Sequence, residues 1–161
     1  MNWLFDKRFI YNRSVNSDDP GLADFFVFLL KYLPILSLLV LMLSVVVGDF
    51  ALAAMICGAA MEEQGLVFWI YHARRPLKAG LKFAICLSIF EVFSYGFTLG
   101  GAHSASSILE LLSLRAAPSA RHLLSALMAY ALIKRQMPVV RVWLICAAFH
   151  IAYNFLIWAL S

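Results

Sequence analysis

Residues 50–71 read FALAAMICGAAMEEQGLVFWIY, an apolar run that carries two adjacent acids, Glu62 and Glu63. About 20 apolar residues are enough for a helix to cross the hydrocarbon core of a bilayer. Insertion scales assign roughly 2.5–3.5 kcal/mol to one acidic side chain at the centre of such a helix. Because the chain carries two of them, we expect the pair to face other polar groups or to take part in chemistry. A helix packed against polar neighbours without any activity is the less favoured alternative.

The composition of the whole chain is typical of a membrane protein. Of its 161 residues, 63% are hydrophobic and only 14% are charged, and the mean hydropathy is +0.85. The net charge of +4 comes from short basic clusters between apolar runs. This distribution orients a protein in a bilayer and argues against a nucleic-acid partner. The three cysteines (Cys57, Cys86 and Cys146) all lie in apolar runs and predict no disulfide framework.

We predict an all-α fold, a polytopic integral membrane bundle of about five transmembrane helices. The expected spans cover residues 25–47, 50–71, 83–99, 118–133 and 142–160. Gly48-Asp49 between the first two spans predicts an antiparallel hairpin. The serine-rich stretch 100–118 allows a sixth, partial span, which would move the C-terminus to the cytoplasmic side. Residues 1–21 predict a cytoplasmic interfacial segment, and residues 22–161 a single transmembrane domain.

The basic residues predict a multi-pass protein of the cell membrane with a cytoplasmic N-terminus. In that orientation, only Arg115 and Arg121 of the 13 lysines and arginines fall on the outer side. The rest fall on the cytoplasmic side, many of them in predicted basic loops over 72–82 and 134–141: Lys7, Arg8, Arg13, Lys31, Arg74, Arg75, Lys78, Lys82, Lys134, Arg135 and Arg141. An excess of positive charge on cytoplasmic loops is the usual pattern of membrane proteins.

Polar side chains occur at similar depths in several of the predicted spans. With a rise of 1.5 Å per residue, Glu62 lies about 18 Å from the outer start of its span, and Glu91 about 12 Å from the inner start of its own. His150 lies at a comparable depth, and Asn154 follows at i+4 on the same face. We therefore expect one internal cavity, with His122 on its outer side, lined by Glu62, Glu63, Glu91, His122, His150 and Asn154.

These residue types fit hydrolysis of a peptide bond within the membrane. One glutamate can take a proton from water as general base, while its neighbour is pushed towards the protonated form. Histidine can orient the water, and an asparagine amide can donate to an oxyanion. A divalent metal such as zinc, held by Glu62, Glu63, His122 and His150, is an alternative that sequence spacing does not decide.

Two readings without proteolysis stay open. In the first, the histidines are structural, because a single histidine in an apolar helix is more often a hydrogen-bonded packing residue than a ligand or a catalytic group. That alternative weighs more for His122, beside Arg121, than for His150, which has partners at its own depth. Acids and histidines near the middle of a membrane also form proton relays, which would make the chain a small proton-coupled carrier.

The order of the motifs resembles the PrsW family of intramembrane proteases, distant relatives of the CAAX prenyl endopeptidases and the bacterial CPBP family. The resemblance covers residues 61–156. Glu62-Glu63 resembles the start of the family's EExxK motif. EVFSYG at 91–96 resembles the family's DGIxYG stretch, and GAH at 101–103 falls where the family has GFA. PSARH at 118–122, followed by Ser125 and Tyr130, resembles the family's histidine helix. HIAYN at 150–154 resembles its closing HxxY[DN] motif.

The resemblance implies an intramembrane endopeptidase whose substrate is a membrane protein cut near or within its span. On this hypothesis Glu62 activates water and Glu63 assists it. His122 and His150 position the water or stabilise the oxyanion, Asn154 supports them, and Glu91 is a partner behind these groups. The chain departs from the family at Leu66, in place of the lysine of EExxK, and at Ser106-Ser107, in place of a Glu-Asn pair. A catalytically inactive relative that binds membrane proteins is therefore the alternative.

Overall fold

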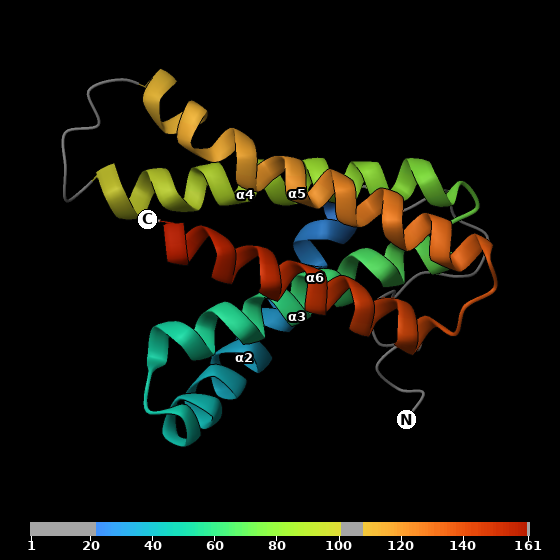
Figure 1. Cartoon of the computed structure of the whole chain (residues 1–161). Coiled ribbons are helices and arrows are strands. Elements are labelled where there is room, and N and C mark those ends of the chain that lie inside the picture. The colour runs from blue at the N-terminus through green and yellow to red at the C-terminus, as the bar shows by residue number, and fades with distance from the viewer. Residues whose placement is uncertain (1–21, 101–107, 161) are drawn as a thin grey trace.

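The computed structural model describes residues 22–100 and 108–160, and these form five α-helices (Figure 1). The predicted all-α class is therefore confirmed. The expected interfacial segment over 1–21, as well as Ser106 and Ser107, lies outside the described residues. The helices are α2 (Leu22–Val47), α3 (Phe50–His72), α4 (Pro76–Gly100), α5 (Ile108–Lys134) and α6 (Val139–Leu160).

Three helices of the described part of the chain are long and apolar enough to cross a membrane. These segments are Asp24–Val47, Phe50–His72 and Val139–Leu156. Many large apolar side chains on their outer faces are exposed, and Leu30 and Val45 of α2 are among the most exposed. A lipid environment would cover these side chains, which fits a membrane location.

Helices α4 and α5 begin earlier than the sequence analysis placed them. The predicted basic loop over 72–82 is wrong in its second half, because α4 begins at Pro76 and includes Lys78 and Lys82. Proline suits the first position of a helix, where its missing N–H has no partner to lose. Much of the serine-rich stretch before Pro118 likewise belongs to α5, which begins at Ile108.

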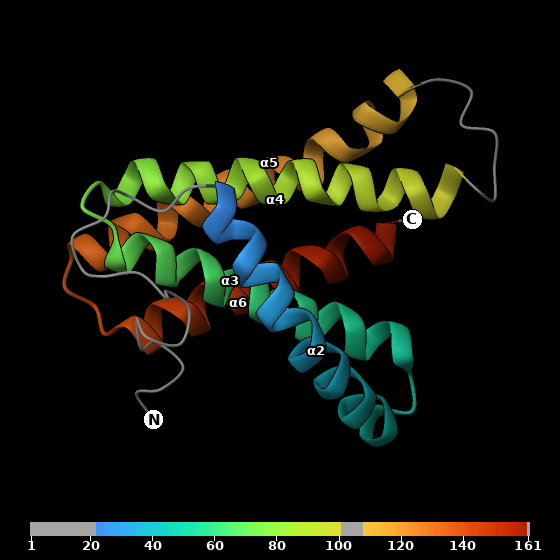
Figure 2. The ribbon, with the colours of Figure 1, turned by 180° about the vertical axis from the view of Figure 1, so that it is seen from behind.

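Helices α2 and α3 form the predicted hairpin, seen most clearly in Figure 2. Gly48 adopts a positive φ of 75°, a conformation that glycine reaches without steric cost. Asp49 then caps α3, because its side chain accepts a hydrogen bond of 3.0 Å from the Leu52 N–H. These two residues end one helix and start the next.

Helices α3 to α6 run alternately in opposite directions. The α3–α4 and α5–α6 connections therefore lie at one end of the bundle (Figures 1 and 2). At the second connection, Gln136 has a φ of 58°, and the Met137 N–H donates to the Leu132 carbonyl at 3.2 Å, which closes the end of α5. The basic residues of both connections are thus gathered at the same end.

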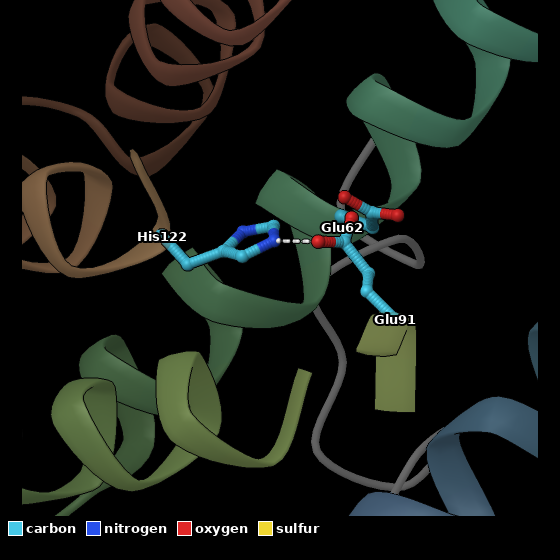
Figure 3. Close-up of side chains that lie close together, drawn as sticks. All are labelled: Glu62, Glu91 and His122. Carbon is cyan, nitrogen blue, oxygen red and sulfur yellow. Dashed lines mark ion pairs between the residues drawn. The ribbon is translucent and has the colours of Figure 1, made fainter. Parts of the chain in front are cut away.

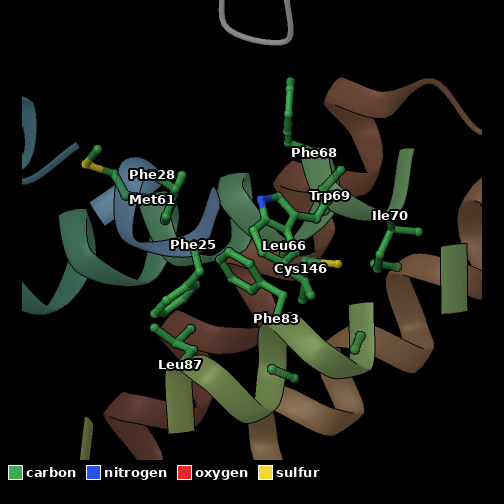
Figure 4. Close-up of a cluster of buried hydrophobic side chains, with 14 of the residues drawn as sticks. Phe25, Phe28, Met61, Leu66, Phe68, Trp69, Ile70, Phe83, Leu87 and Cys146 are labelled. Carbon is green, nitrogen blue, oxygen red and sulfur yellow. The ribbon is translucent and has the colours of Figure 1, made fainter. Parts of the chain in front are cut away.

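Aromatic side chains from α2, α3 and α4 form the core shown in Figure 4. The Phe83 ring meets those of Phe25, Phe28 and Trp69 edge to face, with centroids 5.4, 5.5 and 5.0 Å away. Gly65 lies beneath them, and a Cβ there would come within 2.3 Å of Phe28 Cζ. This close packing fixes the part of α3 that follows Glu62 and Glu63. On the other side, Trp143 of α6 donates a 2.7 Å hydrogen bond to the Ala60 carbonyl.

Candidate active site

Four helices bring all six residues singled out from the sequence into one cluster. Glu62 and Glu63 come from α3, Glu91 from α4, His122 from α5, and His150 and Asn154 from α6. Figure 3 shows the meeting of Glu62, Glu91 and His122. Ion pairs and hydrogen bonds connect the side chains across the helices. The positions of these residues are therefore compatible with one shared site.

Glu63 is a fixed member of the cluster. Its side chain is 1% exposed, and its Oε1 accepts a 2.9 Å hydrogen bond from the Ser125 hydroxyl. His150 Nδ1 lies 3.0 Å from the same oxygen. With the carboxylate as acceptor, Nδ1 carries the proton, which leaves His150 Nε2 as an acceptor. A carboxylate that orients an imidazole in this way sets which nitrogen faces the reacting groups.

Glu62 is the more accessible of the two adjacent acids. Its side chain is 28% exposed, and its Oε2 lies 3.7 Å from His150 Nε2 and 3.9 Å from Arg121 Nη2. Both distances are too long for a direct hydrogen bond. Oε2 is buried without a hydrogen-bond partner among the described residues. A buried acceptor without a partner, beside an imidazole, is a suitable position for a reacting water molecule.

Glu91 and His122 form the second acid–imidazole pair. His122 Nε2 lies 2.9 Å from Glu91 Oε2, the contact dashed in Figure 3. The His122 ring is buried and meets the His150 ring edge to face, with centroids 5.7 Å apart. Two imidazoles, each paired with a different glutamate, thus lie side by side at the centre of the cluster.

Arg121 is a further member of the cluster, which the sequence did not single out as a site residue. The prediction that it falls on the outer side of the membrane stays a prediction, but its side chain is only 4% exposed and lies beside Glu91 in the cluster. Its Nη1 donates to Asn154 Oδ1 at 2.5 Å, and its Nη2 donates to Glu91 Oε1 at 3.2 Å. The guanidinium also lies 5.7 Å from the centre of the Tyr153 ring. The available signal was an arginine within a predicted span, which is costly unless it is paired.

The contact with Arg121 also orients Asn154. Because Oδ1 faces the guanidinium, the amide nitrogen is the end of Asn154 that remains to donate elsewhere.

Comparison of the chain with protein-family models, curated proteins and solved structures finds no match. The resemblance to the PrsW family therefore stays a prediction, and the chemistry has to be inferred from the cluster itself.

The charges of the cluster do not balance when every acid is ionised. Glu62, Glu63 and Glu91 would contribute three negative charges and Arg121 one positive charge, which leaves −2 with neutral imidazoles. Excess charge of this size is strongly unfavourable in a buried site. Protons held by the carboxyl groups, or a bound cation, would restore the balance.

A divalent metal fits the cluster only in part. Glu62, Glu91 and His122 offer ligand atoms that lie within 4.8 Å of one another, and these are donor types that zinc accepts. Glu63, a metal candidate from the sequence, instead faces Ser125 and His150. Arg121 Nη2 lies 3.0 Å from His122 Nε2 and 3.2 Å from Glu91 Oε1. The guanidinium therefore lies against two of these three residues, and its positive charge would repel a cation there.

Proposed function

We propose that this chain is an intramembrane endopeptidase that hydrolyses a peptide bond of a membrane protein with water activated by Glu62. One observation carries the proposal: two adjacent acids have opposite surroundings. Glu63 is 1% exposed, and its Oε1 is held by Ser125 and His150. Glu62 is 28% exposed, and its Oε2 lies no closer than 3.7 Å to His150 and 3.9 Å to Arg121. Each acid keeps its Oε2 without a hydrogen-bond partner among the described residues. Pairs of acids whose environments differ in this way commonly divide structural and chemical roles.

The roles follow from the contacts. Glu62 takes a proton from water as the water oxygen attacks the carbonyl carbon, and later returns that proton to the leaving amine nitrogen. Glu63, supported by Ser125, holds His150 so that Nε2 can accept a hydrogen bond from the attacking water. Arg121 and the amide nitrogen of Asn154 supply N–H donors for the oxygen that becomes negative. Glu91 holds His122 and Arg121 in place.

Arg121 offers an explanation for the missing lysine of the EExxK motif. Leu66, the residue at that motif position, is buried in the apolar core. A lysine there would need to be paired or to lose its charge. In this chain the positive charge next to the acids comes instead from α5, through Arg121. The departure at Leu66 is therefore compatible with an active site.

The proposal includes a multi-pass arrangement in which α2 to α6 cross the membrane, with the N-terminus in the cytoplasm. The alternating directions of α3 to α6 support it, as do the basic residues gathered at one end. The acids would then lie within the bilayer, accessible to a transmembrane segment from the side.

The direct test compares cleavage by the full chain with cleavage by two variants that each change one carboxylate to an amide. Wild type, Glu62→Gln and the control Asp49→Asn are each reconstituted with solubilised membrane proteins, and newly formed N-termini are identified by mass spectrometry. Asparagine caps helices as well as aspartate does, so the control should fold normally. We expect new N-termini with wild type and Asp49→Asn and a loss of at least about 100-fold with Glu62→Gln.

Other outcomes would count against proteolysis. Equal cleavage by Glu62→Gln would remove the proposed role of Glu62. Capture of the same membrane proteins by wild type, Glu62→Gln and His150→Ala, without cleavage by any of them, would indicate an inactive binding subunit. Proton-driven uptake of a solute into liposomes, again without cleavage, would indicate a carrier.

A further inference from the structure

A groove with a volume of about 510 Å³ lies along the first half of α4. It is separate from the acid–imidazole cluster. Tyr130 of α5 borders it on one side. The lining residues are of two kinds, basic and largely apolar: Arg75, Lys78 and Lys82, and Pro76, Leu77, Leu81, Ile85 and Tyr130.

The basic residues lie on one face of the start of α4. Arg75, Lys78 and Lys82 are spaced by three and four residues, which brings their side chains to neighbouring positions on a helix. All three are exposed. No acidic side chain is found among the described residues that line the groove, and none occurs in the first turn of α4. The free N–H groups at the start of a helix add to the attraction for an anion.

The apolar residues continue from this basic end towards the middle of α4. Leu77, Leu81 and Ile85 recur every four residues and thus form one row, about 12 Å long. Ile89 extends the same row and is 52% exposed. The groove therefore has positive charge at the end of the bundle and apolar surface towards its middle.

We propose that this groove binds an anionic phospholipid. Its phosphate would lie against Lys78 and Lys82, and one acyl chain would follow Leu81 and Ile85. A basic pocket between helices at the cytoplasmic side of a membrane protein is a usual place for such a headgroup. A small soluble anion would use only the basic end, and a neutral lipid only the apolar row. An anionic phospholipid is complementary to both parts.

Native mass spectrometry of the full chain in detergent can test the proposal with phosphatidylglycerol and phosphatidylcholine of identical acyl chains. Wild type should bind phosphatidylglycerol more tightly than phosphatidylcholine. Each basic residue beside an anionic headgroup contributes about a fivefold factor, so Lys78→Gln with Lys82→Gln should weaken phosphatidylglycerol binding roughly 30-fold. Phosphatidylcholine binding should not change. Lys78→Arg with Lys82→Arg should retain binding.

The matched control replaces Lys134 and Arg135, two exposed basic residues at the same end of the bundle that do not line the groove. Lys134→Gln with Arg135→Gln should change phosphatidylglycerol binding by less than about threefold. An equal loss in both double variants would mean general attraction to the basic end and would overturn the proposal. So would equal binding of the two lipids by wild type, or displacement of phosphatidylglycerol by glycerol phosphate at equal concentration, which would indicate a small-anion site.

Discussion

Replacing Arg121 with methionine should strongly destabilise the fold. Methionine keeps a long unbranched side chain but removes the guanidinium. Arg121 is 4% exposed and donates to Glu91 and Asn154. Without it, the formal charge of the ionised cluster would change from −2 to −3, and the carboxylate of Glu91 would lose its cation. The substitution therefore tests directly whether this arginine lies inside the bundle.

The size of the effect follows from these contacts. Removing one partner of a buried ion pair costs about 3–5 kcal/mol. Because the Glu91 side chain is 16% exposed, water can partly replace the guanidinium, and we expect about 3 kcal/mol. Glu91→Gln should cost only about 1 kcal/mol or less, since the amide oxygen still accepts from Arg121 and one excess negative charge disappears. The loss of unfolding free energy in the double variant should be smaller than the sum of the two single losses by about 1–2 kcal/mol.

The free energy of unfolding can be measured by titrating the micelle-bound chain with sodium dodecyl sulfate and following helical circular dichroism. The four members of the cycle are compared under identical conditions. Arg141→Met is the control, because Arg141 is an exposed arginine of α6, and it should change stability by less than about 0.5 kcal/mol. If Arg121→Met matched this control, Arg121 would not be a buried partner. Additive effects of Arg121→Met and Glu91→Gln would mean that the two side chains do not interact.

Four further predictions concern packing, the helix end, the support of the site and metal. Gly65→Ala should lower the free energy of unfolding by about 1–3 kcal/mol, because its Cβ would overlap an aromatic ring, whereas Gly58→Ala, with nothing within 4 Å, should be neutral or raise it. Gln136→Gly should raise it by about 1 kcal/mol in the same titration, because glycine accepts a positive φ. Ser125→Ala should lower it by about 1 kcal/mol and also reduce cleavage, since Glu63 loses a hydrogen bond. Elemental analysis of the purified chain should find well under one zinc per chain, and a chelator should leave cleavage unchanged. If the wild-type chain instead held one zinc and the Glu91→Gln variant held none, the position of Arg121 beside Glu91 would be contradicted.

Much of the site follows from the sequence because helical geometry is regular. The rise per residue is fixed, so the depth of an acid or a histidine within its span can be estimated from its position in the chain. In the structure, Glu62 lies 3.7 Å from His150, and its ligand atom lies within 4.8 Å of that of Glu91, as those depths suggest. The hairpin was predicted for a similar reason, since a connection of only two residues, Gly48 and Asp49, requires a tight turn between the helices.

Rotation about the helix axis is the part that the sequence did not provide. Counting positive charges assigns Arg121 to a side of the membrane by its place in the chain, but its direction into the bundle depends on how α5 packs. The same holds for the two glutamates. Adjacent residues of a helix point about 100° apart, so the two side chains face different neighbours, and one of them can be enclosed while the other is not. Only the contacts of Ser125 and His150 show that it is Glu63.

The start of α4 was missed for a related reason. Lys78 and Lys82 were counted as loop residues because they are charged and close to other basic residues. Charged side chains also fit a helix when they occupy an exposed face, as these two do. Pro76 was the signal in favour of a helix, since proline is frequent at the first helical position.

The contrast between the two glutamates bears on the choice between proteolysis and proton transport. A proton relay requires its acids and imidazoles to exchange protons along a path, which is hindered when a carboxylate is held by fixed donors. Glu63 is held by a hydroxyl and an imidazole, and Glu91 by a guanidinium and an imidazole. Among the three acids, only the Glu62 side chain lacks a hydrogen bond or ion pair shorter than 3.7 Å to another described side chain. One uncommitted acid within a rigid frame of donors is what catalysis of water attack requires, because the frame must keep its geometry while a single group accepts the proton.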